Sequence, residues 1–169
     1  ELLVGQGINE YALSETQKYG HVTYFWNGNR SGKVSEELET YEEIPSDNCP
    51  FNEKPAMKCV EIADHLVEAM ESGKYGFLRC NFPNGDMVGH TGDFDAVVTS
   101  MEALDVQLGR IQKAAEQLGY VLCVTADHGN ADVMLEKNKK GAYQVRTAHS
   151  LSPVPFVICG WEGSLRQEG

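Results

Sequence analysis

Short apolar runs alternate with long amphipathic segments along this chain, and that alternation limits its fold more than any other feature. The apolar runs are rich in aromatic and β-branched residues and cover His21–Trp26, Tyr75–Phe82, Tyr120–Thr125 and Pro155–Cys159. Their apolar residues are mostly continuous, which predicts strands covered on both faces, as in a sheet between layers of helices.

Two segments with helical periodicity separate these runs. The first is predicted over Pro55–Ser72, because proline is favoured in a first helical turn and a glycine, Gly73, follows its end. The second is predicted over Phe94–Leu118, with Asp93 as its N-cap and a glycine at its stop.

The acidic stretch 27–54 is rich in turn-forming residues and is expected to be a loop. The order strand, helix, strand, helix, strand, loop, strand then predicts an α/β fold. We expect a three-layer α/β/α sandwich with a largely parallel sheet. Open sheets of this class place their ligands at the carboxyl ends of the strands.

Composition narrows the possible partners. The chain has 169 residues, enough for one domain, and a formal net charge of −11, which disfavours nucleic acid and anionic membranes as partners. An acidic chain that acts on an anionic metabolite needs local positive charge, and bound divalent cations supply it. The five cysteines include no Cys-x-x-Cys pair and are expected to be buried, reduced thiols of a cytoplasmic protein.

Glycine-rich loops follow two of the predicted strands and contain candidate metal ligands. After Tyr75–Phe82, Asp86 and His90 supply an oxygen and an imidazole nitrogen four residues apart, a pairing that suits a borderline divalent cation. After Tyr120–Thr125, the adjacent pair Asp127-His128 offers two more ligands.

His149 lies just before the last predicted strand, so it too is expected at an end of the sheet. Taken singly, each loop is also consistent with a turn-capping aspartate or a solvated histidine. Three of the five histidines nevertheless lie in such loops beside strand ends, and together they predict a metal site.

At these residues the sequence resembles a known family. Residues 84–92, 125–132 and 149–155 resemble, in order and spacing, the cofactor-independent phosphoglycerate mutases of the alkaline phosphatase superfamily. Residues 14–28 resemble the segment that leads into the phosphatase domain of that family, and residues 26–32 look closer to its plant and protist members.

The resemblance implies an alkaline phosphatase-like fold and an isomerase of glycolysis that interconverts 3- and 2-phosphoglycerate through a phosphoserine. It implies two divalent metal ions, Mn²⁺ or Co²⁺ with Mg²⁺ or Zn²⁺ possible, and no 2,3-bisphosphoglycerate. By motif position, one metal would be held by Asp86, His90 and His149. The other would be held by Asp127 and His128.

The resemblance also implies a role for Lys18, which matches a lysine that contacts the transferred phosphoryl group. Residues 1–20 would lead into the domain, and residues 21–169 would form the C-terminal part of the phosphatase domain. The nucleophilic serine, one aspartate ligand and the inserted transferase domain would lie outside these residues. We therefore expect the 169-residue chain alone to be inactive, and the full-length enzyme to be a monomer that binds phosphoglycerate.

Two alternatives remain open at this point. Another enzyme of the superfamily, a phosphopentomutase or a phosphomonoesterase, would share the Asp127-His128-Gly129 element. The context of residues 86–92 and the segment around Lys18 favour the glycerate mutase instead. A non-catalytic fragment that binds metal is the alternative from a different class.

Overall fold

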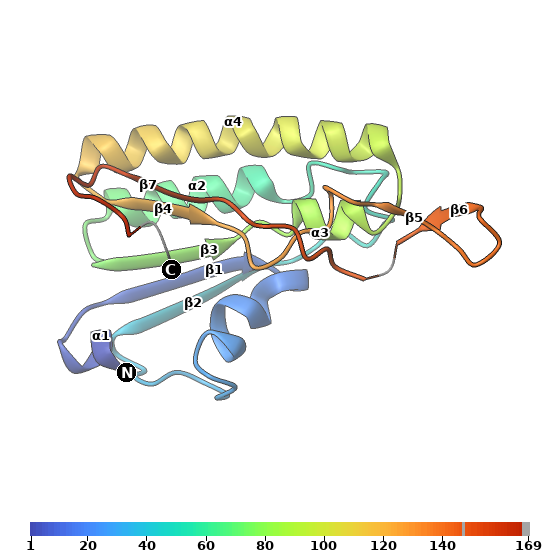
Figure 1. The fold of residues 1–169 in the computed structure, drawn as a ribbon. Helices are drawn as coiled ribbons and strands as arrows, with labels where there is room; N and C mark the ends of the chain where they lie inside the picture. Colours follow the sequence, from blue (N-terminus) through green and yellow to red (C-terminus); the bar gives the residue numbers. More distant parts are fainter. Residues whose placement is uncertain (147, 167–169) are drawn as a thin grey trace.

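Three parallel strands form the main sheet of the computed structural model, which describes residues 1–146 and 148–166 (Figure 1). Strand β1 (Glu10–Glu15) lies in the middle, with β2 (Glu39–Ile44) on one side and β3 (Phe77–Asn81) on the other. Thr147 and residues 167–169, which belong to the predicted C-terminal part of the phosphatase domain, lie outside the described residues.

Two helices cover one face of this sheet. Figure 1 shows α2 (Cys59–Glu71) and α4 (Phe94–Leu118) side by side above the strands. Tyr11 and Leu13 alternate along β1 and belong to the same buried cluster as Ile62 of α2. This packing buries apolar side chains from both layers, which is the main source of stability for an α/β fold.

A short helical segment covers part of the opposite face. Arg79 of β3 is buried there and pairs with Glu10 of β1 at 2.7 Å. Its Nε atom also donates to the carbonyl oxygen of Val22, at 2.8 Å, within the π-helical turn η2 (His21–Phe25). Because a buried charge needs partners, this pair and its hydrogen bond fix η2 against the sheet.

Helix α4 follows the predicted boundaries. The Asp93 side chain accepts a hydrogen bond from the Ala96 amide at 3.1 Å, and Gly119 ends the helix in the left-handed conformation at φ 74°. The other long helix, α2, begins at Cys59 rather than at Pro55. It ends at Glu71, close to the predicted Ser72.

Three of the four predicted strands are also confirmed. Strand β4 (Leu122–Thr125) pairs antiparallel with β7 (Phe156–Cys159), while β3 occupies most of the predicted run Tyr75–Phe82. The fold class is therefore α/β with a parallel sheet, as expected.

The remaining elements are short. Helix α1 covers Leu2–Gly5, the 3₁₀ turn η1 covers Thr16–Lys18 and helix α3 covers Asn84–Gly89. The hairpin of β5 (Leu135–Lys137) and β6 (Tyr143–Val145) protrudes at the right of Figure 1.

The strand predicted over His21–Trp26 is wrong, because most of this run forms η2. Its aromatic and β-branched residues favour strands, but only Val22 and Thr23 are buried, and Phe25 and Trp26 are exposed. A short run of strand-forming residues predicts a strand only weakly, because tertiary contacts can favour another backbone conformation.

The loop predicted over 27–54 is also wrong in part, because it contains the edge strand β2. The loop was predicted from the turn-forming residues of this stretch, which do not reveal the strand between them. Glu42 accepts a hydrogen bond from Tyr11, and Glu43 accepts one from Thr16. Charged residues are a common feature of edge strands. The neighbouring strand β1, in the predicted leading segment, was not anticipated either.

The cysteines depart from expectation in one respect. All five are free thiols, but Cys123 on β4 is exposed and only Cys59 is fully buried. Among the described residues, no helix has the length and apolar character needed to cross a membrane.

Candidate metal centre

The candidate site residues come from the carboxyl ends of three strands and from the start of a fourth. Lys18 follows β1 on the turn η1, Asp86 follows β3 on α3, and Asp127 follows β4. His149 precedes β7. Because β7 runs antiparallel to β4, its start lies at the same end of the sheet.

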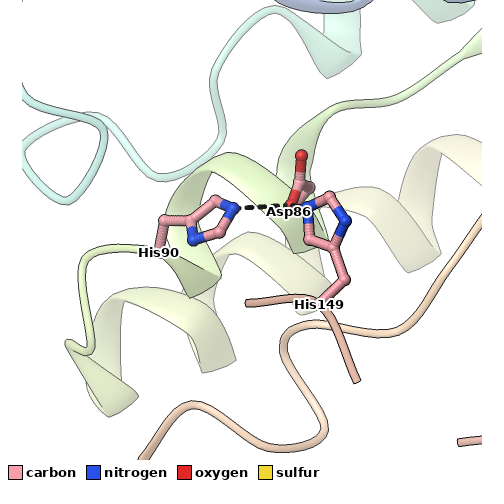
Figure 2. Close-up of side chains that lie close together, drawn as sticks. All are labelled: Asp86, His90 and His149. Atoms are coloured by element: carbon pink, nitrogen blue, oxygen red, sulfur yellow. Dashed lines mark ion pairs between the residues drawn. The ribbon is translucent and has the colours of Figure 1, made fainter. Parts of the chain in front are cut away.

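Asp86, His90 and His149 form a three-residue cluster (Figure 2). Asp86 lies in α3 and His90 is the C-cap residue of that helix, one turn further on, so the two side chains are neighbours. The Oδ1 atom of Asp86 lies 3.1 Å from Nε2 of His90 and 3.1 Å from Nε2 of His149. The ligating atoms all lie within 4.8 Å of one another.

The donor set of this cluster fits a divalent metal ion. One carboxylate and two imidazoles are ligands that Mn²⁺, Co²⁺ and Zn²⁺ accept. The Asp86 side chain is 12% exposed, whereas that of His149 is 45% exposed, so the cluster has a mostly buried carboxylate at its base and opens toward solvent. An open side is typical of metal sites that also bind a substrate.

Lys18 lies between the two aspartates. Its buried ammonium is 2.7 Å from Oδ2 of Asp86 and 3.7 Å from Oδ2 of Asp127, and 3.3 Å from Nε2 of His128. Burial raises the pKa of Asp86, but the hydrogen bond and positive charge of Lys18 outweigh it, with help from Asn130 and His90. The pKa of Asp86 is therefore lower than usual, and its side chain is a carboxylate at neutral pH.

Asp127 and His128 form the second part of the site. Nε2 of His128 lies 3.5 Å from Oδ2 of Asp127, and its ring stacks on His149 with centroids 3.5 Å apart. All five predicted ligands and Lys18 thus gather in one place. Within the described residues, however, Asp127 and His128 are not part of a second three-residue cluster.

Sequence reasoning missed three residues that support the ligand candidates. Asn130 donates from Nδ2 to Oδ1 of Asp86 at 2.8 Å. The Ser150 hydroxyl lies 2.8 and 3.0 Å from the carboxylate oxygens of Asp132. Their position within the recognised motifs was the available signal, but nothing in the sequence revealed these contacts.

An apolar cleft of about 560 Å³ extends from the site between β3 and β4. These two strands are not hydrogen-bonded to each other. The cleft is lined by apolar side chains of both strands and of the helices above, including Cys80, Leu104, Leu108, Ile111, Leu122 and Val124. It also reaches Lys18, Asp86 and Asp127.

The fold and the cluster together define an α/β domain with a candidate metal centre at the carboxyl ends of its strands. The family model described as the metalloenzyme superfamily matches residues 1–168. This chain belongs to that superfamily.

Comparison with curated proteins and solved structures narrows the similarity. The chain is 56% identical, over 95% of its length, to the 2,3-bisphosphoglycerate-independent phosphoglycerate mutase of Trypanosoma brucei brucei, of which it covers 30%. It is 50% identical, over 95% of its length, to the mutase of the same name from Nicotiana tabacum, again covering 30%. Protist and plant relatives are therefore among the matches, as expected.

A solved structure is also similar, a phosphoglycerate mutase of Leishmania mexicana crystallised at low cobalt concentration. It matches with a TM-score of 0.91 and 49% identity over 98% of this chain and 32% of that one. The alkaline phosphatase-like α/β fold is thereby supported. The chain spans about 30% of the length of the curated relatives named here.

Proposed function

We propose that this chain is the metal-binding part of a cofactor-independent phosphoglycerate mutase. The observation that carries the proposal is the gathering of Asp86, His90 and His149 within 4.8 Å, beside Lys18 and the Asp127-His128 pair. The names of the similar proteins support the same activity, the interconversion of 3- and 2-phosphoglycerate without 2,3-bisphosphoglycerate.

In this proposal, Asp86, His90 and His149 hold one divalent cation, and Asp127 and His128 contribute to a second. When bound, such cations neutralise phosphoryl oxygens and activate a hydroxyl nucleophile. Mn²⁺ and Co²⁺ fit the mixed oxygen and nitrogen ligands best, and Mg²⁺ and Zn²⁺ are the alternatives. The cobalt named for the Leishmania structure is consistent with this choice.

Lys18 has a separate part in the proposal. Its ammonium is buried and directed at Asp86 and Asp127, two of the proposed metal ligands, which supports a contact between Lys18 and a phosphoryl group bound at that site. A fixed positive charge at that place stabilises the negative charge of the phosphoryl oxygens during transfer. We propose that Lys18 binds this group rather than acting as a proton donor.

We further propose that the rest of the enzyme lies outside these 169 residues. That remainder would supply the nucleophilic serine, an aspartate ligand and the transferase domain. The incomplete second ligand set supports this division. So does the cleft of about 560 Å³ between β3 and β4, because a strand supplied by the remainder could lie there and pair with both of these strands. We propose a monomer acting in glycolysis in the cytoplasm, where the five free cysteines would stay reduced.

The test is a coupled assay of 3-phosphoglycerate conversion by the full-length enzyme, with no 2,3-bisphosphoglycerate added. We expect turnover that a chelator abolishes and that Mn²⁺ or Co²⁺ restores. Asp127→Ala should lower kcat by at least about 100-fold, because it removes a metal ligand. The exposed Asp105→Ala on α4 is the matched control and should retain full activity.

The same assay separates the alternatives. A panel of phosphopentoses and simple phosphomonoesters tests the other enzymes of the superfamily, and preference for either would contradict the glycerate mutase. The isolated 169-residue chain should show no conversion even if it binds metal. Measurable conversion by that chain would overturn the proposed division of the site.

A further inference from the structure

The turn of residues 129–132 contacts both of the other segments that hold ligand candidates. It continues directly from Asp127-His128, donates from Asn130 to Asp86, and accepts from Ser150, the neighbour of His149. We propose that Asn130 and Asp132 are positioning residues, which fix the three ligand segments relative to one another. This inference rests on the proposed metal site, and neither residue is itself proposed as a ligand.

Asn130 fixes the orientation of the Asp86 carboxylate. It is 6% exposed, and its Nδ2 donates to Oδ1 of Asp86 at 2.8 Å, while Lys18 lies 2.7 Å from Oδ2. Both oxygens are therefore held, and the carboxylate cannot rotate without breaking a contact. Oδ1 of Asp86 is also the oxygen that faces His90 and His149. The hydrogen bond from Asn130 uses one lone pair of this oxygen and leaves the other free in the direction of the cluster.

The close approach of helix α3 to this turn requires a glycine. A Cβ atom on Gly89 would lie 2.6 Å from Oδ1 of Asn130 and 3.2 Å from the amide nitrogen of Ala131. Any side chain there would push the turn away from α3. The absence of a side chain at Gly89 therefore allows the Asn130 amide to reach Asp86.

Asp132 holds the segment that contains His149. The Ser150 hydroxyl is 2.8 Å from Oδ2 of Asp132, and the Ser150 amide donates to the Gly129 carbonyl at 2.9 Å. Ser150 is 6% exposed, and a Cβ atom on Gly129 would lie only 2.2 Å from its hydroxyl oxygen. Two hydrogen bonds and close packing thus fix the backbone beside His149, whose ring stacks on His128.

These contacts explain how separate segments reach one site. Asp86 and His90 come from α3 and its C-cap, and His149 comes from the segment before β7. Each segment is tied to the turn by a partly buried polar contact. Residues that orient metal ligands by hydrogen bonds commonly change metal affinity by about 10- to 100-fold when they are removed. Loss of either contact is therefore expected to appear first in metal affinity.

The experiment measures Co²⁺ binding to the metal-free full-length enzyme by calorimetry, together with the visible absorption spectrum of the bound Co²⁺. Asn130→Ala and Asp132→Ala should each raise the Kd for Co²⁺ by at least about 10-fold and alter the spectrum. Asp132→Asn should bind within about threefold of the wild type, because its side-chain oxygen still accepts from Ser150.

Two controls separate positioning from stability. Asn9→Ala removes a comparable hydrogen bond, from Nδ2 to the Lys74 carbonyl at 3.0 Å, but at the amino end of β1. It should leave the Kd and spectrum unchanged. Ser150→Ala tests the Asp132 contact from its other side with little change in volume. It should reproduce the loss caused by Asp132→Ala. Melting temperatures of the metal-free variants report any loss of folding.

The outcomes are distinct. Unchanged Co²⁺ affinity and spectrum in Asn130→Ala and Asp132→Ala, with lower melting temperatures alone, would overturn the inference and leave a structural role. A loss in Asp132→Asn as large as that in Asp132→Ala would overturn the hydrogen-bond argument. If the wild type binds Co²⁺ but does not convert phosphoglycerate, the proposed function fails while the positioning result stands. If the wild type does not bind Co²⁺, both fail.

Discussion

The imidazole ring of His128 stacks on that of His149, with centroids 3.5 Å apart and planes inclined by 8°. One ring follows β4 and the other precedes β7, so the antiparallel pairing of these strands brings the two histidines together. Each ring therefore forms part of the surroundings of the other, and the two proposed metal sites share a boundary.

Removal of the metal should destabilise the full-length enzyme. A ligand present at 100 times its Kd stabilises a folded protein by about 2.7 kcal/mol. We expect a chelator to lower the melting temperature and Co²⁺ or Mn²⁺ to restore it. His149→Ala should lose most of the metal-dependent rise. His65→Ala should keep this rise, because His65 lies on α2, pairs with Glu42 of β2 and is not part of the cluster. Equal rises in both variants would contradict the cluster.

Arg79→Met should cost about 3–5 kcal/mol of unfolding free energy, because it leaves Glu10 buried without its partner. Urea unfolding of the full-length enzyme measures this loss. The double variant Arg79→Met, Glu10→Gln should recover part of it, since no unpaired charge remains. A double variant that loses as much stability as the sum of the two single changes would contradict the pairing.

Ile62→Ala should lower the unfolding free energy by about 2–5 kcal/mol, because Ile62 is fully buried between α2 and the sheet. Val60 lies on the same helix and is 43% exposed. Val60→Ala is therefore the matched control and should cost less than about 1 kcal/mol. Similar losses at the two positions would indicate that α2 packs differently.

Glu15 should make stability depend on pH in an unusual direction. Burial raises the pKa of Glu15 by more than its hydrogen bond from the Lys58 amide lowers it. The folded state therefore binds a proton more tightly than the unfolded state does. The stabilisation from the protonated form is complete below the unfolded pKa, and it is lost as pH rises through the higher folded pKa.

Glu15→Gln stays neutral and can still accept from the Lys58 amide. Relative to the wild type, this variant should gain stability between about pH 4 and pH 7. Urea unfolding at both pH values measures the difference. The same change at the exposed Glu37 should produce no such gain. A constant difference between Glu15→Gln and the wild type across this range would contradict the raised pKa.

Local sequence signals predicted those parts of the fold that depend on local interactions. Helix α4 was predicted over Phe94–Leu118, between the capping residues Asp93 and Gly119, because capping and periodicity act within a few residues. The elements that failed depend on distant partners. Strand β2 is acidic and forms because it pairs with β1, and η2 is fixed by Arg79 from another strand.

The candidate site likewise has a part that the sequence predicted and a part that depends on contacts between distant segments. Asp86, His90 and His149 were recognisable from their loops, and the structure brings them together. The contacts of Asn130 and Asp132 were not recognisable, since each depends on the packing of one loop against another. Side-chain identity predicts which groups can bind a metal, whereas their supporting hydrogen bonds require the three-dimensional arrangement.

The position of Lys18 has a consequence for how the protein matures. Its ammonium lies against Asp86 and near Asp127, so these two ligand candidates have a cation of their own within the chain. A newly synthesised chain can thus assemble these carboxylates before any metal ion arrives, without strong repulsion between them. In the proposed metal site, loading with the ion would then be a step separate from folding.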